Sequence, residues 1–100
     1  MATANQWMQI FERIGDPAAV EMLAEEAAEL SAKASKLARI LRAENPSRTT
    51  LADAFGEMKE ELADVLNAAA VLDVGWNGSL SNDRSDIQAK KMTRWYESLF

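Results

Sequence analysis

Apolar residues recur at steps of three and four along most of the chain, a pattern that predicts α-helices. In the segment 17–43 the series is Leu23, Ala27, Leu30, Ala34, Leu37 and Leu41. In the segment 50–73 it is Leu51, Phe55, Met58, Leu62, Val65, Ala69 and Leu72. Both series have the mean spacing of about 3.5 residues that lets two helices pack along one seam. The alternating apolar and polar residues typical of β-strands do not occur, so we expect no sheet.

Turn-forming residues divide the chain into four expected helices, over 3–14, 17–43, 50–73 and 82–99. Gly15-Asp16-Pro17 separates the first two, since Asp caps a helix and Pro fits its first position. Asn45-Pro46-Ser47 ends the second, because a residue before Pro avoids helical backbone. Thr50 resembles the N-cap of the third, and Gly75-Trp76-Asn77-Gly78 forms the last turn. The short link between the two long helices predicts an antiparallel hairpin, within one all-α domain over residues 1–100.

Composition narrows the chemistry that this domain can perform. The chain has 100 residues with 11 basic and 16 acidic side chains, a net charge of −5, and neither Cys nor His. Disulfides, zinc–thiolate sites and His-based catalysis are therefore excluded. The acidic balance argues against a nucleic acid polymer as partner. The sequence has no membrane-spanning apolar run and no signal peptide, so we expect a cytoplasmic protein without a membrane partner.

Four carboxylates stand on the same flank of the two predicted seams. Glu26 and Glu29 each precede a seam residue of the second predicted helix, and Glu61 and Asp64 do so in the third. In an antiparallel hairpin these flanks face each other, and the two pairs lie at depths that differ by only about 5 Å at 1.5 Å rise per residue. We therefore expect all four carboxylates to converge.

Converging carboxylates repel one another unless a cation neutralises them. Oxygen ligands without His or Cys favour a hard ion, Mg²⁺, Mn²⁺ or Ca²⁺. Such an ion keeps positions open for water and phosphate oxygens, the geometry of metal-assisted phosphoanhydride hydrolysis. The alternative is that the acidic pairs are surface residues of Glu-rich helices facing solvent.

Basic and aromatic residues add weaker indications. Lys33, Lys36 and Arg39 follow the first acidic pair, and Lys90, Lys91 and Arg94 stand on the last predicted helix. They are candidates to neutralise a leaving pyrophosphate, although ordinary surface pairs with Glu are the favoured explanation for each one. The aromatic residues Trp7, Phe11, Trp76 and Trp95 are better explained as core or interface residues than as base-stacking rings.

The acidic residues carry a family resemblance. Glu25-Glu26-Ala27-Ala28-Glu29 followed by Glu61-Leu62-Ala63-Asp64 resembles the EExxE…ExxD motif of the MazG-like all-α nucleoside triphosphate pyrophosphohydrolase superfamily. The similarity to its small bacterial and phage branch covers roughly residues 20–100. It includes the segments 23–30, 36–39, 45–46, 60–66 and 91–95. The chain departs from the branch at Asn45-Pro46-Ser47-Arg48, where Asn-Pro-Thr-Pro is common.

The resemblance implies an antiparallel four-helix bundle assembled as a dimer or tetramer. It implies hydrolysis of an NTP or dNTP between the α and β phosphates, giving nucleoside monophosphate and pyrophosphate, in nucleotide-pool house-cleaning. The implied ligands of Mg²⁺, or Mn²⁺, are Glu26, Glu29, Glu61 and Asp64. The implied catalytic residues are Glu25, Glu61 and Asp64. The implied phosphate-binding residues are Lys36, Arg39, Lys91 and Arg94.

Two other functions remain open at this stage. Phosphoribosyl-ATP pyrophosphohydrolases use a similar acidic pattern, although the basic last helix and the Asn45-Pro46 loop argue against that activity. A non-catalytic helical oligomerisation or accessory module would keep the fold without turnover. It would bind neither Mg²⁺ nor Mn²⁺, which calorimetry can test.

Overall fold

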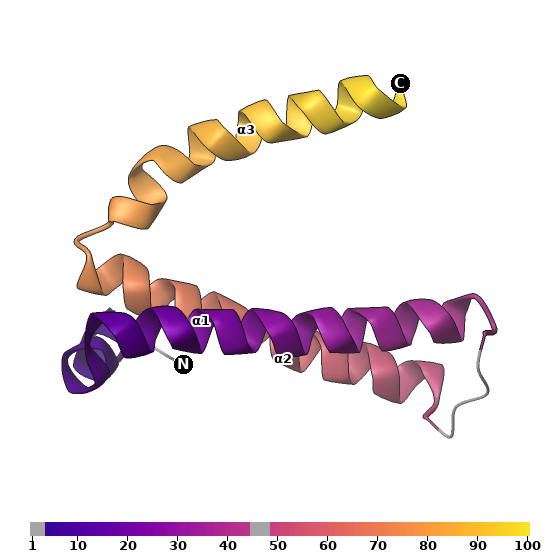
Figure 1. Cartoon of the computed structure of the whole chain (residues 1–100), viewed down its shortest axis with the longest axis horizontal. Helices are drawn as coiled ribbons and strands as arrows, with labels where there is room; N and C mark the ends of the chain where they lie inside the picture. The colour runs from indigo at the N-terminus through magenta and orange to yellow at the C-terminus, as the bar shows by residue number, and fades with distance from the viewer. Residues whose placement is uncertain (1–3, 45–48) are drawn as a thin grey trace.

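The chain folds into a helical hairpin from which a third helix projects (Figure 1). The computed structural model describes residues 4–44 and 49–100, and all regular secondary structure in these ranges is helical. The helices are α1 (Ala4–Leu41), α2 (Leu51–Gly75) and α3 (Ser79–Leu99). In the same ranges no helix is long and apolar enough to cross a lipid bilayer. The all-α prediction is confirmed, and the predicted turn Asn45-Pro46-Ser47 lies outside the described residues.

The first two predicted helices are joined into α1, so residues 4–44 and 49–100 contain three helices where four were expected. Only Gly15 departs from helical geometry, with φ 81° and ψ 173°. A side chain at this positive φ would be strained, which explains glycine at the bend. Pro17 follows two residues later, at the start of the second part of α1, where a missing N–H is tolerated. The predicted break is therefore a sharp bend, and the segment before it turns back towards the hairpin.

Local capping sets the ends of α2 and α3. The Thr50 hydroxyl accepts a hydrogen bond from the Asp53 N–H at 3.1 Å, as the capping pattern predicts. α3 begins at Ser79, three residues before its predicted start. The earlier start is supported by Asp73, whose Oδ1 accepts hydrogen bonds from the N–H groups of Leu80 at 3.1 Å and Ser81 at 3.0 Å. Through these two hydrogen bonds Asp73, near the end of α2, caps the first turn of α3.

The core lies at the end of the hairpin near the bend in α1. Ala19, Val71 and Leu72 are buried there, and Trp7, Phe11, Met22, Leu23 and Trp76 pack against them. The Trp76 indole N–H also donates a hydrogen bond to Asp16 at 2.7 Å. The aromatic rings before the bend are thus packed onto the hairpin, in agreement with their interpretation as core residues.

The α2 residues that face α1 match the predicted seam in part. Leu72 is buried as predicted, and Met58, Val65 and Ala69 are partly buried. Ala54 and Ala68 are also buried, whereas the predicted seam residues Leu51, Phe55 and Leu62 are exposed. Small alanine side chains allow two helices to approach closely, so α2 turns its alanine stripe towards α1. This rotation by one position has two consequences. It moves Glu61 from the flank into the helix interface, and it leaves a second apolar stripe of α2 outside.

Candidate metal centre

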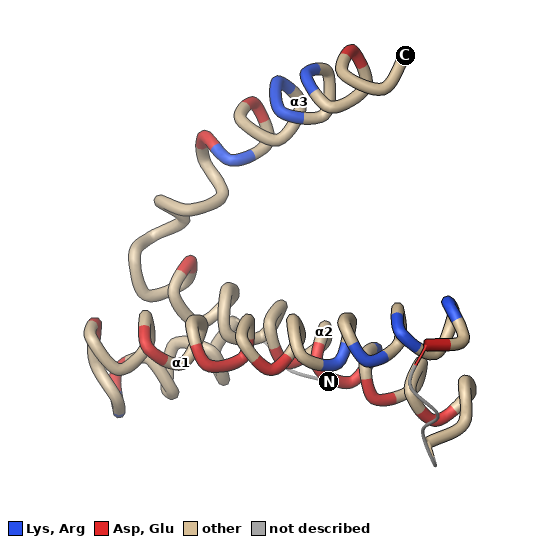
Figure 2. The backbone as a smooth tube through the Cα atoms, turned by 45° about the vertical axis from the view of Figure 1, so that its right-hand side comes forward, with Lys and Arg blue, Asp and Glu red and all other residues tan. Residues whose placement is uncertain are grey.

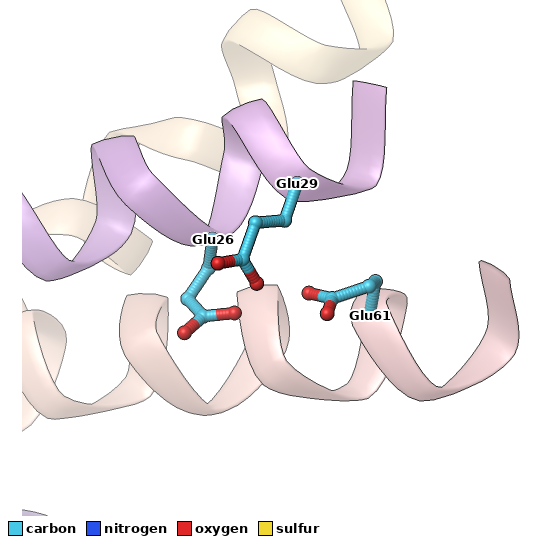
Figure 3. Close-up of side chains that lie close together, drawn as sticks. All are labelled: Glu26, Glu29 and Glu61. Atoms are coloured by element: carbon cyan, nitrogen blue, oxygen red, sulfur yellow. The ribbon is translucent and has the colours of Figure 1, made fainter. Parts of the chain in front are cut away.

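Three carboxylates from the two long helices meet between α1 and α2, two of them half-buried and one, Glu29, exposed. Glu26 and Glu29 come from α1 and Glu61 from α2, and their side chains point towards one another (Figure 3). One oxygen from each carboxylate lies within 4.8 Å of the others. The spacing of three residues places Glu26 and Glu29 on one face of α1. The rotation of α2 presents Glu61 to that face.

Burial makes this arrangement electrostatically unfavourable without a cation. Glu26 and Glu61 are half-buried, and one oxygen of each is buried without a hydrogen-bond partner. The pKa of Glu61 is raised from 4.5 to about 7. Desolvation is the largest cause, and hydrogen bonds with Glu29 and Glu26 and the repulsion from their charges add to it. The site therefore favours either a bound proton or a bound cation.

The donor set fits a hard divalent cation. Three carboxylates from two helices supply only oxygen ligands, the donors preferred by Mg²⁺, Mn²⁺ and Ca²⁺. The two partnerless buried oxygens are also acceptors that an ion would satisfy. A site built from three side chains leaves positions for water and for an anionic ligand.

The other two predicted acidic residues lie outside this group of three. Asp64, predicted as the fourth ligand, is exposed and lies on the wall of a neighbouring pocket that Glu26 also lines. Glu25 is exposed on α1. The prediction of one convergent cluster is therefore confirmed for Glu26, Glu29 and Glu61, and the structure does not bring Asp64 or Glu25 into it.

The neighbouring pocket has a volume of about 730 Å³ and lies between the segment before the bend and the hairpin. The Trp7 indole N–H donates a hydrogen bond to the Asn67 side-chain oxygen at 3.2 Å across it. Its lining combines apolar and polar side chains: Gln6, Trp7, Gln9, Ile10, Arg13, Ile14, Met22, Glu26, Asp64, Asn67, Ala68 and Val71. Six of these twelve residues are apolar and six are polar, a mixture that suits an organic ligand with polar groups, and a cation at the carboxylates would offset the acidic Glu26 and Asp64.

Sequence reasoning missed Arg13 and Asn67 as pocket residues. Asn67 follows Asp64 by three residues, so it stands on the same face of α2 one turn later, and this spacing was an available signal. Arg13 carried no such signal, because its place in the pocket depends on the direction in which α1 bends at Gly15.

The predicted phosphate-binding residues are divided between α1 and α3. Lys36 forms an ion pair with Glu57 at 3.2 Å, and Lys33 approaches the same carboxylate at 3.8 Å. Glu57 stands one helical turn before Glu61 on α2. Arg39 is exposed in the last turn of α1. Lys91 and Arg94 are exposed on α3, which contacts α2 but not α1 (Figure 2). Within one chain, Lys91 and Arg94 therefore stand apart from α1, the helix that carries Glu26 and Glu29.

Comparisons of the chain with models of protein families, with curated proteins and with solved structures find no match. The case for a function therefore rests on the carboxylate group, the pocket beside it and the motif resemblance.

Proposed function

We propose that the protein is a Mg²⁺-dependent nucleotide pyrophosphohydrolase that cleaves an NTP or dNTP between the α and β phosphates. The observation that carries this proposal is the convergence of Glu26, Glu29 and Glu61, with two buried oxygens that have no partner. The resemblance of the acidic motif to the MazG-like superfamily supports the same reaction. House-cleaning of the nucleotide pool is the role that this activity would serve.

Each acidic residue has a distinct part in the proposal. Glu26, Glu29 and Glu61 hold the ion, which supplies charge neutralisation for the phosphates and a more acidic bound water. Asp64, on the pocket wall beside Glu26, accepts the proton released when a water oxygen attacks the α phosphorus. The bond from that phosphorus to the bridging oxygen breaks, and pyrophosphate leaves. Glu25, which the motif implies as a further catalytic residue, is exposed on α1 beside Glu26.

The pocket supports a nucleoside as the organic part of the substrate. The Trp7 ring and the aliphatic side chains of Ile10 and Val71 provide apolar contacts for a base or sugar. The Asn67 amide oxygen is held by Trp7, which leaves its NH₂ group as a donor for a ring acceptor. Arg13, on the same lining, provides positive charge for a phosphate oxygen.

We also propose that the active unit is a homodimer or a tetramer. Lys91 and Arg94 stand on a helix that does not contact α1 of its own chain. If these residues bind phosphate, as the resemblance implies, a neighbouring subunit must bring them to the carboxylates.

The test is pyrophosphate release from a panel of NTPs, dNTPs, damaged nucleotides and phosphoribosyl-ATP, with Mg²⁺ or Mn²⁺. We expect turnover of at least one nucleoside triphosphate. Glu61→Gln should lower turnover by at least about 100-fold, as expected for the loss of a charged ligand at the reacting centre. Glu60→Gln is the matched control, because this exposed neighbour loses the same charge outside the cluster. Turnover of phosphoribosyl-ATP alone would indicate the related pyrophosphohydrolase activity, and no turnover with either ion would refute both enzymes.

A non-catalytic helical module is the second candidate, because only three of the four predicted ligands converge. Isothermal calorimetry separates the candidates. An enzyme binds Mg²⁺ or Mn²⁺ in a manner that depends on Glu61, whereas a module without a metal site shows no binding.

A further inference from the structure

The folded chain exposes more surface than a compact protein of its size. Its accessible surface is 7592 Å², whereas a compact monomer of this mass exposes about 5,600 Å². Its radius of gyration is 16.6 Å, compared with about 13 Å for a compact domain of this length. The excess of about 2,000 Å² per chain is of the size that an obligate homodimer buries.

Part of this surface is the second apolar stripe of α2. Leu51, Phe55, Leu62 and Leu66 recur at steps of four or seven on the helix, and each of them is at least 46% exposed. Leu62 is 46% exposed and Leu66 is 62% exposed. From Leu51 to Leu66 the stripe extends for about 22 Å at 1.5 Å per residue. We call this surface the outer stripe of α2.

The other part is α3, on which no residue is buried. Its large apolar residues also follow helical spacing, and Trp95 is 63% and Leu99 78% exposed. From Ile87 to Leu99 they cover about 18 Å, which is comparable with the outer stripe. A helix this exposed has no tertiary contacts to stabilise most of its length. We call the surface formed by Ile87, Met92, Trp95, Tyr96 and Leu99 the apolar stripe of α3.

α3 projects away from the hairpin and does not fold back onto it (Figure 1). Asp73 fastens its first turn to α2 through two backbone hydrogen bonds. Beside that turn, a groove of about 760 Å³ runs between Leu66 on α2 and Ile87 on α3. The chain therefore holds the two apolar stripes apart, with this groove at the end where α2 and α3 are joined.

Charge indicates which helix fits there. Among the exposed residues of α2, three are acidic (Asp53, Glu60 and Asp64) and one is basic (Lys59), a net charge of −2, because Glu57, Glu61 and Asp73 already have partners within the chain. α3 carries four basic and three acidic residues, a net charge of +1, and Lys90, Lys91 and Arg94 lie in its second half (Figure 2). A basic amphipathic helix of matching length is what α2 would attract, and α3 of a second copy has those properties.

We propose that two copies of the chain associate through the outer stripe of α2 and the apolar stripe of α3, each α3 lying along α2 of the other copy. Because both surfaces are present on every chain, a twofold axis buries each of them twice. This inference deepens the self-association proposed above and is independent of any hydrolytic activity.

The experiment is light scattering and sedimentation of the full-length protein across a concentration series. We expect twice the 11.0 kDa chain mass at micromolar concentration. Leu66→Glu on α2 and Trp95→Glu on α3 should each raise the dimer Kd by at least about 100-fold, since each buries an unpaired charge. Val20→Glu is the matched control. It changes an equally apolar α1 residue, 45% exposed, outside both stripes, and should leave the dimer intact.

If Leu66→Glu unfolds the chain, Arg94→Glu provides a second test of the same interface. Arg94 is exposed, so Arg94→Glu leaves the hairpin core unchanged, and it should weaken association about tenfold at low salt and less at high salt. A wild-type chain that is monomeric at 100 μM would overturn the proposal, even if it binds lipid vesicles instead. A dimer that neither Trp95→Glu nor Arg94→Glu weakens would overturn this choice of surface. A monomer that still hydrolyses nucleotides would refute the interface and not the enzyme.

Discussion

Replacing Glu61 by glutamine should affect the stability of the metal-free protein and its response to Mg²⁺ in different ways. In the folded protein the pKa of Glu61 is raised from 4.5 to about 7, first by desolvation and then by Glu29 and Glu26. Between these two pH values the folded state holds a proton that the unfolded state has released. The stability that this proton contributes is complete below pH 4.5 and is lost as the pH rises through about 7.

Glutamine mimics the protonated carboxyl and does not titrate. Metal-free Glu61→Gln should therefore lack the part of the stability loss that wild type shows between pH 4.5 and 7. Above pH 7 the variant should melt at a higher temperature than wild type, because one of three repelling charges is gone. The measurement is the thermal unfolding midpoint at fixed protein concentration from pH 4 to 8.5, in EDTA.

Addition of Mg²⁺ should reverse the order of the two proteins. At a free concentration ten times its Kd, a ligand that binds only the folded state stabilises it by about 1.4 kcal/mol. For a domain of this length, that corresponds to a rise of about 6–11 °C in the unfolding midpoint of wild type. Glu61→Gln should show little of this rise, and the exposed control Glu60→Gln should show all of it.

Parallel pH profiles for wild type and Glu61→Gln would mean that the carboxylates do not meet as described. An equal Mg²⁺ response in both would mean that Glu61 is not a ligand. Either result would remove the physical basis of the proposed site.

Three further changes test the fold that positions the site. Gly75→Ala should destabilise the protein by about 1–3 kcal/mol in urea unfolding, because the added methyl group overlaps the Phe11 ring. Gly56 lies in the interior of α2 with open space around it, so Gly56→Ala should be neutral or stabilising by up to about 1 kcal/mol. Equal effects at both positions would contradict the packing of Phe11 against Gly75. Asp73→Ala should cost about 0.5–2 kcal/mol and accelerate amide hydrogen exchange in the first turn of α3, so unchanged exchange there would argue against this cap. Lys36→Met should change the free energy of unfolding by less than about 1 kcal/mol, since its ion pair with Glu57 is partly exposed and screened by solvent. A larger loss of stability that is the same at low and high salt would contradict this expectation.

The positions of the helices were largely predictable because their signals are local. Thr50 begins α2 through a hydrogen bond to a residue three positions away, and the bend lies at Gly15 as expected. The approach of the two acidic segments was also predicted, from helical spacing and an antiparallel hairpin, whereas the rotation of α2 that turns Glu61 into the cluster was not. The predicted features depend on residues within one helix or on one short connection.

The places where prediction was wrong or incomplete involve a choice between surfaces of the same helix. α2 has an alanine stripe with Ala54 and Ala68 and an outer stripe with Leu62, and periodicity alone favoured the bulkier one. The structure packs the alanine stripe on α1, which leaves Asp64 outside the cluster.

The sequence by itself determined that this chain is helical, where its helices bend or end, and that acidic residues share one side of the hairpin. Tertiary structure alone decided which stripe of α2 meets α1, how the segment containing Trp7 and Arg13 closes a pocket, and that α3 stands away from the core. The reason is that helix formation is governed by neighbours in sequence. The rotation and direction of a helix instead depend on the whole surface that it buries against residues distant in the chain.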